Sequence, residues 1–218
     1  MENNGKGIFY GVIGVATLIV AIIGATFAFF SASATNDNTI AGQTLDVTSS
    51  FTLNVEKVTF SGTTAASNDL VPADLNGGET TGINQALTAK CEKDGYTGCH
   101  LYKITAESGQ KLSTASITID SLAATNDPAQ NWKYSVFTGS ESSADTLVKN
   151  DTFNSIQTKA FDMHSGAAVN ADTPVVYYLL IYLENTESDQ STTDAGSYSG
   201  SVSFKAAGSG EISASFTA

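Results

Sequence analysis

The sequence predicts an all-β protein: a jelly-roll-like antiparallel β-sandwich preceded by one N-terminal apolar helix. The first thirty or so residues are strongly apolar, whereas the rest of the 218-residue chain is polar and acidic. Beyond Ser31, short runs of alternating apolar residues are separated by Gly, Asn, Asp and Ser, a pattern typical of antiparallel strands. The remaining part, about 190 residues, is the size of one domain and can bury a core without metals or disulfides.

An apolar segment over residues 8–30 opens the chain. Its sequence IFYGVIGVATLIVAIIGATFAFF carries no charge and follows a short polar stretch that contains Lys6. A helix of about 20 apolar residues matches the hydrocarbon thickness of a bilayer. We therefore expect residues 1–28 to act as a signal peptide or membrane anchor. Residues 8–30 would contact the membrane before cleavage, or permanently if no cleavage occurs.

The end of this segment contains two candidate cleavage sites. Small residues at positions −3 and −1 direct signal peptidase. Thr26-Phe27-Ala28 meets this requirement and would leave Phe29 as the first residue of the mature chain. The triplet 32–34 offers a later site, and the long apolar run fits an uncleaved anchor equally well.

Residues 48–218 are predicted to form the sandwich, with about eight to ten strands. Alternation places one face of five runs toward the core. The inward positions are Phe51, Leu53 and Val55; Ile117 and Ile119; Trp132, Tyr134 and Val136; Val202, Phe204 and Ala206; and Ile212, Ala214 and Phe216.

One run, VVYYLLIYL over residues 175–183, is apolar on both faces and predicts a central strand. Its second face would need cover from a neighbouring segment or subunit. Residues 65–81 and 185–199 are interpreted as long polar loops, and residues 147–158 are compatible with short helical turns.

Two cysteines, Cys91 and Cys99, lie eight residues apart around a polar turn that contains two glycines. In an exported chain, an even cysteine count with this spacing indicates a structural disulfide that closes a hairpin. The alternative is a pair of free thiols.

The charge balance argues against nucleic acid as a partner. The chain has 22 acidic and 10 basic residues, none of them Arg, for a net charge of −12. Such a surface repels phosphate backbones and anionic lipid headgroups. It suits a secreted or cell-surface domain, because net charge limits nonspecific association.

Both ends of the chain resemble the TasA/camelysin family of secreted fibre and biofilm-matrix proteins of Gram-positive bacteria. At the N-terminal end, GATFAFF (24–30) followed by TIAGQTLDV (39–47) is similar to the end of the family's signal peptide and its first strand. At the C-terminal end, YYLLIYLEN and YSGSVSFKAAGSGEISASF resemble the family's closing strands. The likeness covers about a third of the chain.

The resemblance implies a jelly-roll subunit that is exported by the general secretory route. It also implies fibres, a homopolymer in which the N-terminal segment of one copy completes the sheet of the next. The donor strand would lie within residues 29–47, an N-terminal extension of the sandwich. Strand addition satisfies the unpaired backbone groups of a sheet edge. The donor residues are Phe29, Phe30, Ile40, Leu45 and Val47.

The sequence contains no recognisable catalytic motif, so we expect no enzyme activity and no cofactor. Camelysin is described as a protease, but H-E-x-x-H is absent and the two histidines, His100 and His164, lie far apart in sequence. We interpret both as ordinary loop or strand-end residues, and we expect no metal site. The acidic loop over residues 184–194 could gather calcium, but it lacks the regular spacing of a calcium loop.

The leading functional prediction is therefore a structural subunit of an extracellular fibre or biofilm matrix. Two alternatives stay open: a pilin-like filament subunit that retains its apolar N-terminal helix, and a monomeric surface-anchored adhesin. A surface hydrolase is disfavoured by the missing motifs.

Overall fold

The computed structural model describes residues 51–63, 69–75, 79–125, 131–186, 197–206 and 210–218. All of them belong to one compact unit, Asn36–Ala218. The strands are β1 (Phe51–Lys57), β2 (Glu92–Lys93), β3 (Tyr96–Thr97), β4 (Cys99–Ser108), β5 (Leu112–Ala124), β6 (Trp132–Ser140), β7 (Ser143–Thr152), β8 (Phe161–Val169), β9 (Val175–Leu183), β10 (Tyr198–Ala206) and β11 (Glu211–Thr217). The helices are α2 (Thr80–Thr88) and α3 (Phe153–Thr158).

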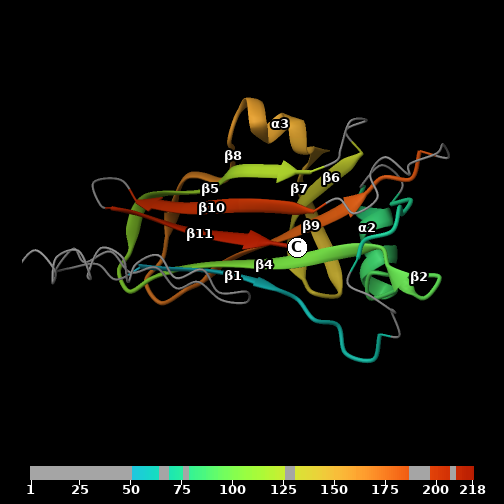
Figure 1. Cartoon of the computed structure of the whole chain (residues 1–218). Helices are drawn as coiled ribbons and strands as arrows, with labels where there is room; N and C mark the ends of the chain where they lie inside the picture. The colour runs from blue at the N-terminus through green and yellow to red at the C-terminus, as the bar shows by residue number, and fades with distance from the viewer. Residues whose placement is uncertain (1–50, 64–68, 76–78, 126–130, 187–196, 207–209) are drawn as a thin grey trace, which may run out of the picture. The chain divides into compact units, whose positions relative to one another are not determined.

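Two antiparallel sheets form a sandwich (Figure 1). Sheet A has five strands in the order β1-β4-β9-β6-β7, and sheet B has four in the order β11-β10-β5-β8. The small hairpin β2-β3 forms a third, two-stranded sheet. The prediction of an all-β sandwich is confirmed.

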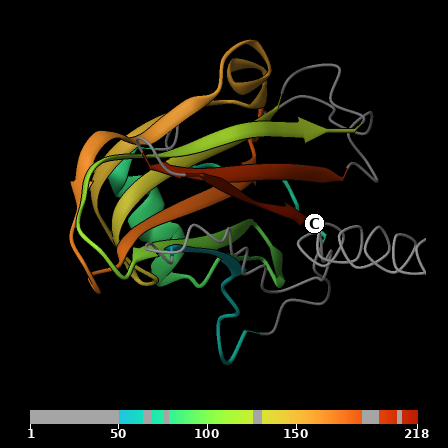
Figure 2. The same ribbon diagram turned by 90° about the vertical axis from the view of Figure 1, so that its left-hand side faces the viewer.

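The main core lies between the sheets and includes the inward positions that alternation predicts, together with residues of β4, β8, β9 and α3. Phe51, Ile117, Tyr134, Phe204 and Ile212 all belong to it and are at most 4% exposed. Helix α3, at the top of Figures 1 and 2, adds Phe153 and Ile156 to this core. The predicted helical turns in 147–158 are thus present at the C-terminal half of that stretch, whereas its first half continues β7.

Strand β9 lies in the middle of sheet A, between β4 and β6, as its doubly apolar sequence predicts. Leu179 and Ile181 point into the main core, whereas Tyr178, Leu180 and Tyr182 belong to a second apolar cluster on the outer face of the sheet. Neighbouring residues in a strand point to opposite faces, so this strand needs two covers.

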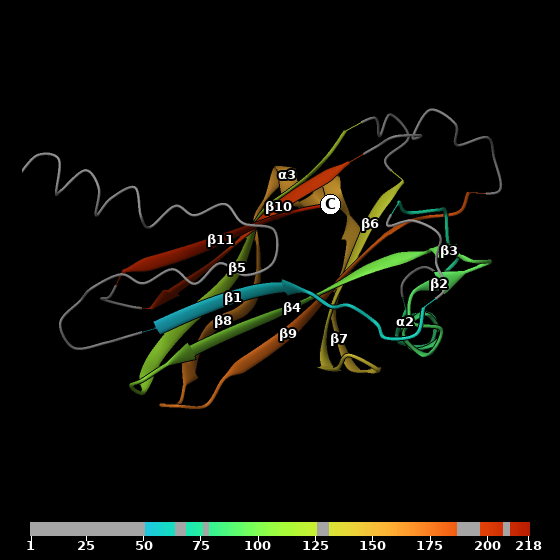
Figure 3. The ribbon, with the colours of Figure 1, turned by 60° about the horizontal axis from the view of Figure 1, so that its bottom comes forward.

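The outer cover comes from the connection between β1 and β4, which we call the cap and define as residues 69–75 and 79–98. Ile83 and Leu87 of α2 and Leu75 pack on the outer face of sheet A. Ala73 N donates to Leu183 O at 2.9 Å, so the cap also joins the end of β9 through the backbone. Figure 3 shows α2, β2 and β3 together at one end of the sandwich.

Helix α2 corrects one expectation. Residues 65–81 were predicted to be loop, but the helix begins at Thr80, and residues 69–75 run beside β9 and β3 through the bridges Ala73↔Glu184 and Leu70↔Thr97. Gly82 permits this packing, because a Cβ there would lie 1.8 Å from the carbonyl oxygen of Leu75.

Candidate functional site

The edges of the two sheets are the first candidate site, since a sheet edge is where a strand from another molecule can add. Within the described residues, β1, β7, β8 and β11 are each hydrogen-bonded to a single strand. These four edges differ in how well they could accept a partner.

The β7 edge is blocked at one point by the cap. Asn84 of α2 uses both atoms of its amide: Nδ2 donates to Ala144 O at 3.2 Å, and Oδ1 accepts from Ala144 N at 2.6 Å. The side chain therefore occupies the backbone groups that an added strand would use. The sequence gives no signal for this role, because the two residues are 60 positions apart.

The β8 edge is irregular. Its pairing with β5 shifts register between Leu112 and Ala115, between Ala115 and Ile117, and between Ile117 and Thr118. Gly166 in β8 has φ +61°, a left-handed conformation that breaks the extended backbone. Bulges of this kind hinder regular strand addition.

The β1 and β11 edges are regular. Both strands pair with their neighbours over seven residues without a register shift. Because Val58 N donates to Leu101 O, the alternating antiparallel pattern directs the N–H groups of Phe51, Leu53 and Val55 away from β4. These donors form a row along the outer edge of β1.

Both regular edges lie on the same side of the sandwich. The rings of Phe51 in β1 and Phe204 in β10 meet edge to face at 5.5 Å, and those of Tyr102 and Phe216 in β11 lie 4.5 Å apart. Figure 3 shows β1 at this side, next to β4. A strand that adds to this side would extend a sheet whose edge is already held by aromatic packing between the two sheets.

The disulfide closes the cap. Cys91 and Cys99 are bonded, with their Cα atoms 4.9 Å apart, which confirms the predicted pairing. Its setting differs from a simple hairpin clasp, because Cys91 follows the end of α2 and Cys99 begins β4. Lys90 and Cys91 both adopt left-handed backbone conformations, with φ of 57° and 55°. The bond therefore ties the end of the helix to sheet A.

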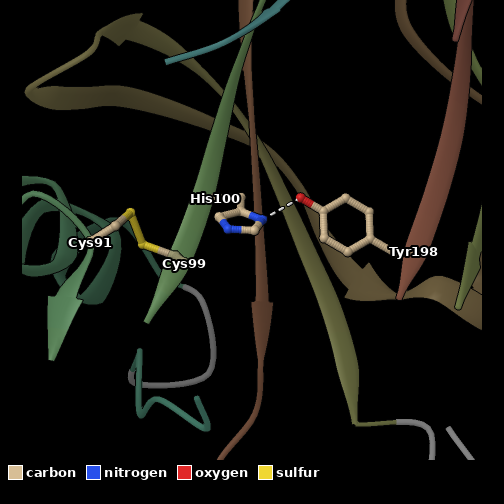
Figure 4. Close-up of a disulfide and its surroundings, with 4 residues drawn as sticks. All are labelled: Cys91, Cys99, His100 and Tyr198. Atoms are coloured by element: carbon tan, nitrogen blue, oxygen red, sulfur yellow. Dashed lines mark hydrogen bonds between the residues drawn. A yellow bond between two sulfur atoms is a disulfide. The ribbon is translucent and has the colours of Figure 1, made fainter. Parts of the chain in front are cut away.

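On the opposite face of β4, His100 takes part in a buried hydrogen-bonded chain, whose first bond, to Tyr198, is drawn in Figure 4. Its Nδ1 lies 2.5 Å from the Tyr198 hydroxyl, which lies 2.8 Å from the Tyr102 hydroxyl. Tyr102 in turn donates to Thr217 O at 3.2 Å. The chain joins β4 of sheet A to β10 and β11 of sheet B. Burial raises the pKa of Tyr198 well above its ordinary value, and the neighbouring Tyr102 raises it further.

The two histidines lie in strands rather than in loops. His100 is the second residue of β4 and is buried, in agreement with a strand-end position, whereas His164 lies within β8 near the Tyr177 hydroxyl, at 3.4 Å. The described residues contain no group of three or more His, Cys, Asp or Glu placed to hold a metal ion. Glu184, at the start of the acidic loop, pairs with Lys133 at 3.1 Å. Residues 187–196 of that loop lie outside the described residues.

The predicted N-terminal features also lie outside the described residues. They are the apolar segment 8–30, the cleavage site Ala28 and Phe29, and the donor residues Phe30, Ile40, Leu45 and Val47. Where the structure is described, no helix is both long and apolar enough to cross a membrane.

Comparison with known proteins adds no relative: no family model matches the chain, and no curated protein sequence matches it.

Proposed function

We propose that this protein is a structural subunit of an extracellular fibre or biofilm matrix, without catalytic activity, that assembles by donor-strand exchange. The observation that carries the proposal is the regular edge side formed by β1 and β11. The predicted donor, residues 29–47, stands a few residues before β1 in the chain. A copy of the chain thus combines an accepting edge with a strand-like N-terminal extension.

The winding of the chain supports a jelly-roll fold. The chain passes from sheet A to sheet B, or back, at the connections β4–β5, β5–β6, β7–β8, β8–β9 and β9–β10. Repeated crossing between two antiparallel sheets is a feature of jelly rolls. The fold fits the resemblance of both chain ends to the TasA/camelysin family.

The disulfide supports an extracellular location. Structural disulfides form and persist in oxidising compartments such as the cell exterior. The proposed export through residues 1–28 would bring the domain there, and the acidic surface fits a secreted or surface-displayed protein.

The assembly is tested by electron microscopy of the mature chain and of a chain that begins at Asp46. We expect the mature chain to form filaments with time and concentration, and the shortened chain to stay folded and not to assemble. A mature chain that stays monomeric at high concentration would instead favour a monomeric surface adhesin.

The accepting edge is tested by single lysines, since charged side chains on an edge strand oppose pairing with another strand. Thr52→Lys in β1 and Ser215→Lys in β11 change exposed residues of the two regular edges. Thr146→Lys, at an exposed position of β7, is the matched control. We expect Thr52→Lys or Ser215→Lys to suppress filaments and Thr146→Lys to leave them; normal filaments from both edge variants would show that this side does not accept the donor.

A further inference from the structure

A small hollow beside the disulfide is lined by basic and uncharged residues only, which is unusual in this acidic chain. Its volume is about 90 Å³, and it lies where the end of β1, the residues after it, the end of the cap and the start of β4 meet. Eleven residues line it, among them Lys57, Thr59, Lys90, Cys91, Cys99 and Leu101. None of these is acidic, although the chain as a whole carries a net charge of −12.

Four of the nine described lysines form ion pairs and five do not, and both lysines of the hollow belong to the second group. Lys103, Lys133, Lys149 and Lys205 each form an ion pair with a carboxylate. Among the residues that the structure describes, Lys57 and Lys90 form no ion pair. Both ammonium groups therefore lack a carboxylate partner there, even though acidic residues outnumber basic ones by 22 to 10.

Lys57 is half-buried and points toward the interior side of sheet A. It pairs with Tyr102 across the β1–β4 ladder, and directly paired residues place their side chains on the same face of the sheet. Burial lowers its pKa from the ordinary value for lysine. A partly buried cation without a counter-charge is unfavourable, so the site gains stability from an anion.

Lys90 is held at the rim of the hollow by its surroundings. Its Nζ donates to Ser61 O at 2.6 Å, and the next residue, Cys91, is fixed by the disulfide to Cys99. An ammonium group has three N–H donors, so two remain for a ligand after the bond to Ser61. The cation is thus positioned before any ligand arrives.

We infer that this hollow binds one small oxyanion of the phosphate or sulfate class. Lys57 and Lys90 supply the charge, and Thr59 also lines the hollow. The Thr63 hydroxyl donates to Phe60 O at 3.4 Å, so its proton is already used. At about 30 Å³ per water molecule, the volume corresponds to about three waters, which suits one tetrahedral anion.

The test is a titration of the full chain, held in a maltoside detergent that carries no phosphate, with inorganic phosphate at constant ionic strength. Amide NMR shifts of Thr59, Cys91 and Leu101 should change and saturate, and chloride should leave them unchanged. Glycerol 3-phosphate distinguishes the source: saturation with it shows that the site also takes phosphate esters, whereas saturation with phosphate alone restricts the site to the free ion. If inorganic phosphate does not saturate these shifts, the proposal is wrong.

Variants assign the binding to the two lysines. Lys57→Met and Lys90→Met should each weaken phosphate binding by about tenfold or more, the loss expected for one charged hydrogen bond. Lys57→Arg keeps the charge and should retain binding. It therefore shows whether Lys57→Met weakens binding by removing the cation or by disturbing the fold. Lys111→Met removes the same charge from an exposed site away from the hollow and is the matched control. Equal affinity in the Lys57→Met, Lys90→Met and Lys111→Met variants would overturn the assignment.

Discussion

The side chains that point away from the main core differ between the two sheets. Under the cap, those of sheet A are large and apolar, whereas those of sheet B are mostly hydroxyls and carboxylates. Leu101, Phe137, Tyr178 and Leu180 on sheet A are buried under the cap. The corresponding face of sheet B presents rows of polar residues, such as the cross-strand row Ser213, Ser203, Thr118 and Asp162. Among the described residues, the cap covers part of the outer face of sheet A, whereas the outer face of sheet B carries mainly polar side chains; we call the latter the bare face.

The bare face satisfies its polar groups within the sheet. Ser203 donates to Asp120 at 2.9 Å, and Thr118 donates to Asp162 at 2.7 Å. Short hydroxyl side chains can bond across strands without an apolar cover. The difference indicates that sheet A depends for its stability on a segment inserted between β1 and β4, whereas sheet B does not.

The largest effect is expected from a cavity under the cap. Leu180 is fully buried, so Leu180→Ala should lower the free energy of unfolding by about 3 kcal/mol. Ser215→Ala on the bare face should change it by less than about 0.5 kcal/mol. Denaturant unfolding of the full chain, followed through the single tryptophan Trp132, measures both. Similar losses in the two variants would contradict the comparison.

Removal of the disulfide should have the next largest effect. Replacing both Cys91 and Cys99 by Ser should cost about 2 to 3 kcal/mol in the chain-entropy model, because the closed loop is short. Hydrogen exchange should rise mainly in α2 and in residues 69–75. An equal rise in β10 and β11 would show that the cap does not unfold separately from the sandwich.

The sequence predicts the parts of this molecule whose pattern is local. Alternation at Phe51 to Val55 or Ile212 to Phe216 reports directly which face of a strand is inward. The doubly apolar β9 also implied a cover, but not which segment supplies it. Helix α2 buries only two large apolar side chains, Ile83 and Leu87, among its nine residues, which is too weak a pattern for a clear helical prediction; such a short helix is stable only through tertiary packing.

Features of the candidate sites depend on contacts between distant residues. The bond between His100 and Tyr198 joins positions 98 apart, and Asn84 meets Ala144 across 60 positions. No spacing or motif in the sequence brings such pairs together. The disulfide was predictable because its cysteines are close in sequence, and that proximity limits the geometry.

A smaller effect is expected where the cap meets the β7 edge. Asn84→Ala leaves the backbone N–H and C=O of Ala144 without their described partner, so the free energy of unfolding should fall by about 1 kcal/mol. The exposed neighbour Gln85→Ala should have little effect and is the control. Denaturant midpoints compare the two variants; equal midpoints would mean that water replaces the Asn84 amide without loss.

The smallest effect is expected from the Asp120 carboxylate on the bare face, and its contribution to stability changes with pH in a defined direction. Burial raises the pKa of Asp120 above its ordinary value; the bond from Ser203 opposes this, and the nearby charges of Glu211 and Asp162 add to it.

A carboxyl with a raised pKa in the folded state favours folding while it is protonated, below its unfolded pKa. That contribution is lost as the pH rises through the folded pKa. At neutral pH, Asp120→Asn should therefore stabilise the domain slightly, because the amide oxygen can still accept from Ser203 and carries no charge. The gain should disappear in acid, where the native carboxyl is protonated. Thermal unfolding of the unmodified chain and of the Asp120→Asn variant, from acid to neutral pH, measures this gain. Asp145→Asn on β7 removes the same charge from sheet A, and an equal gain there would mean that only net charge matters.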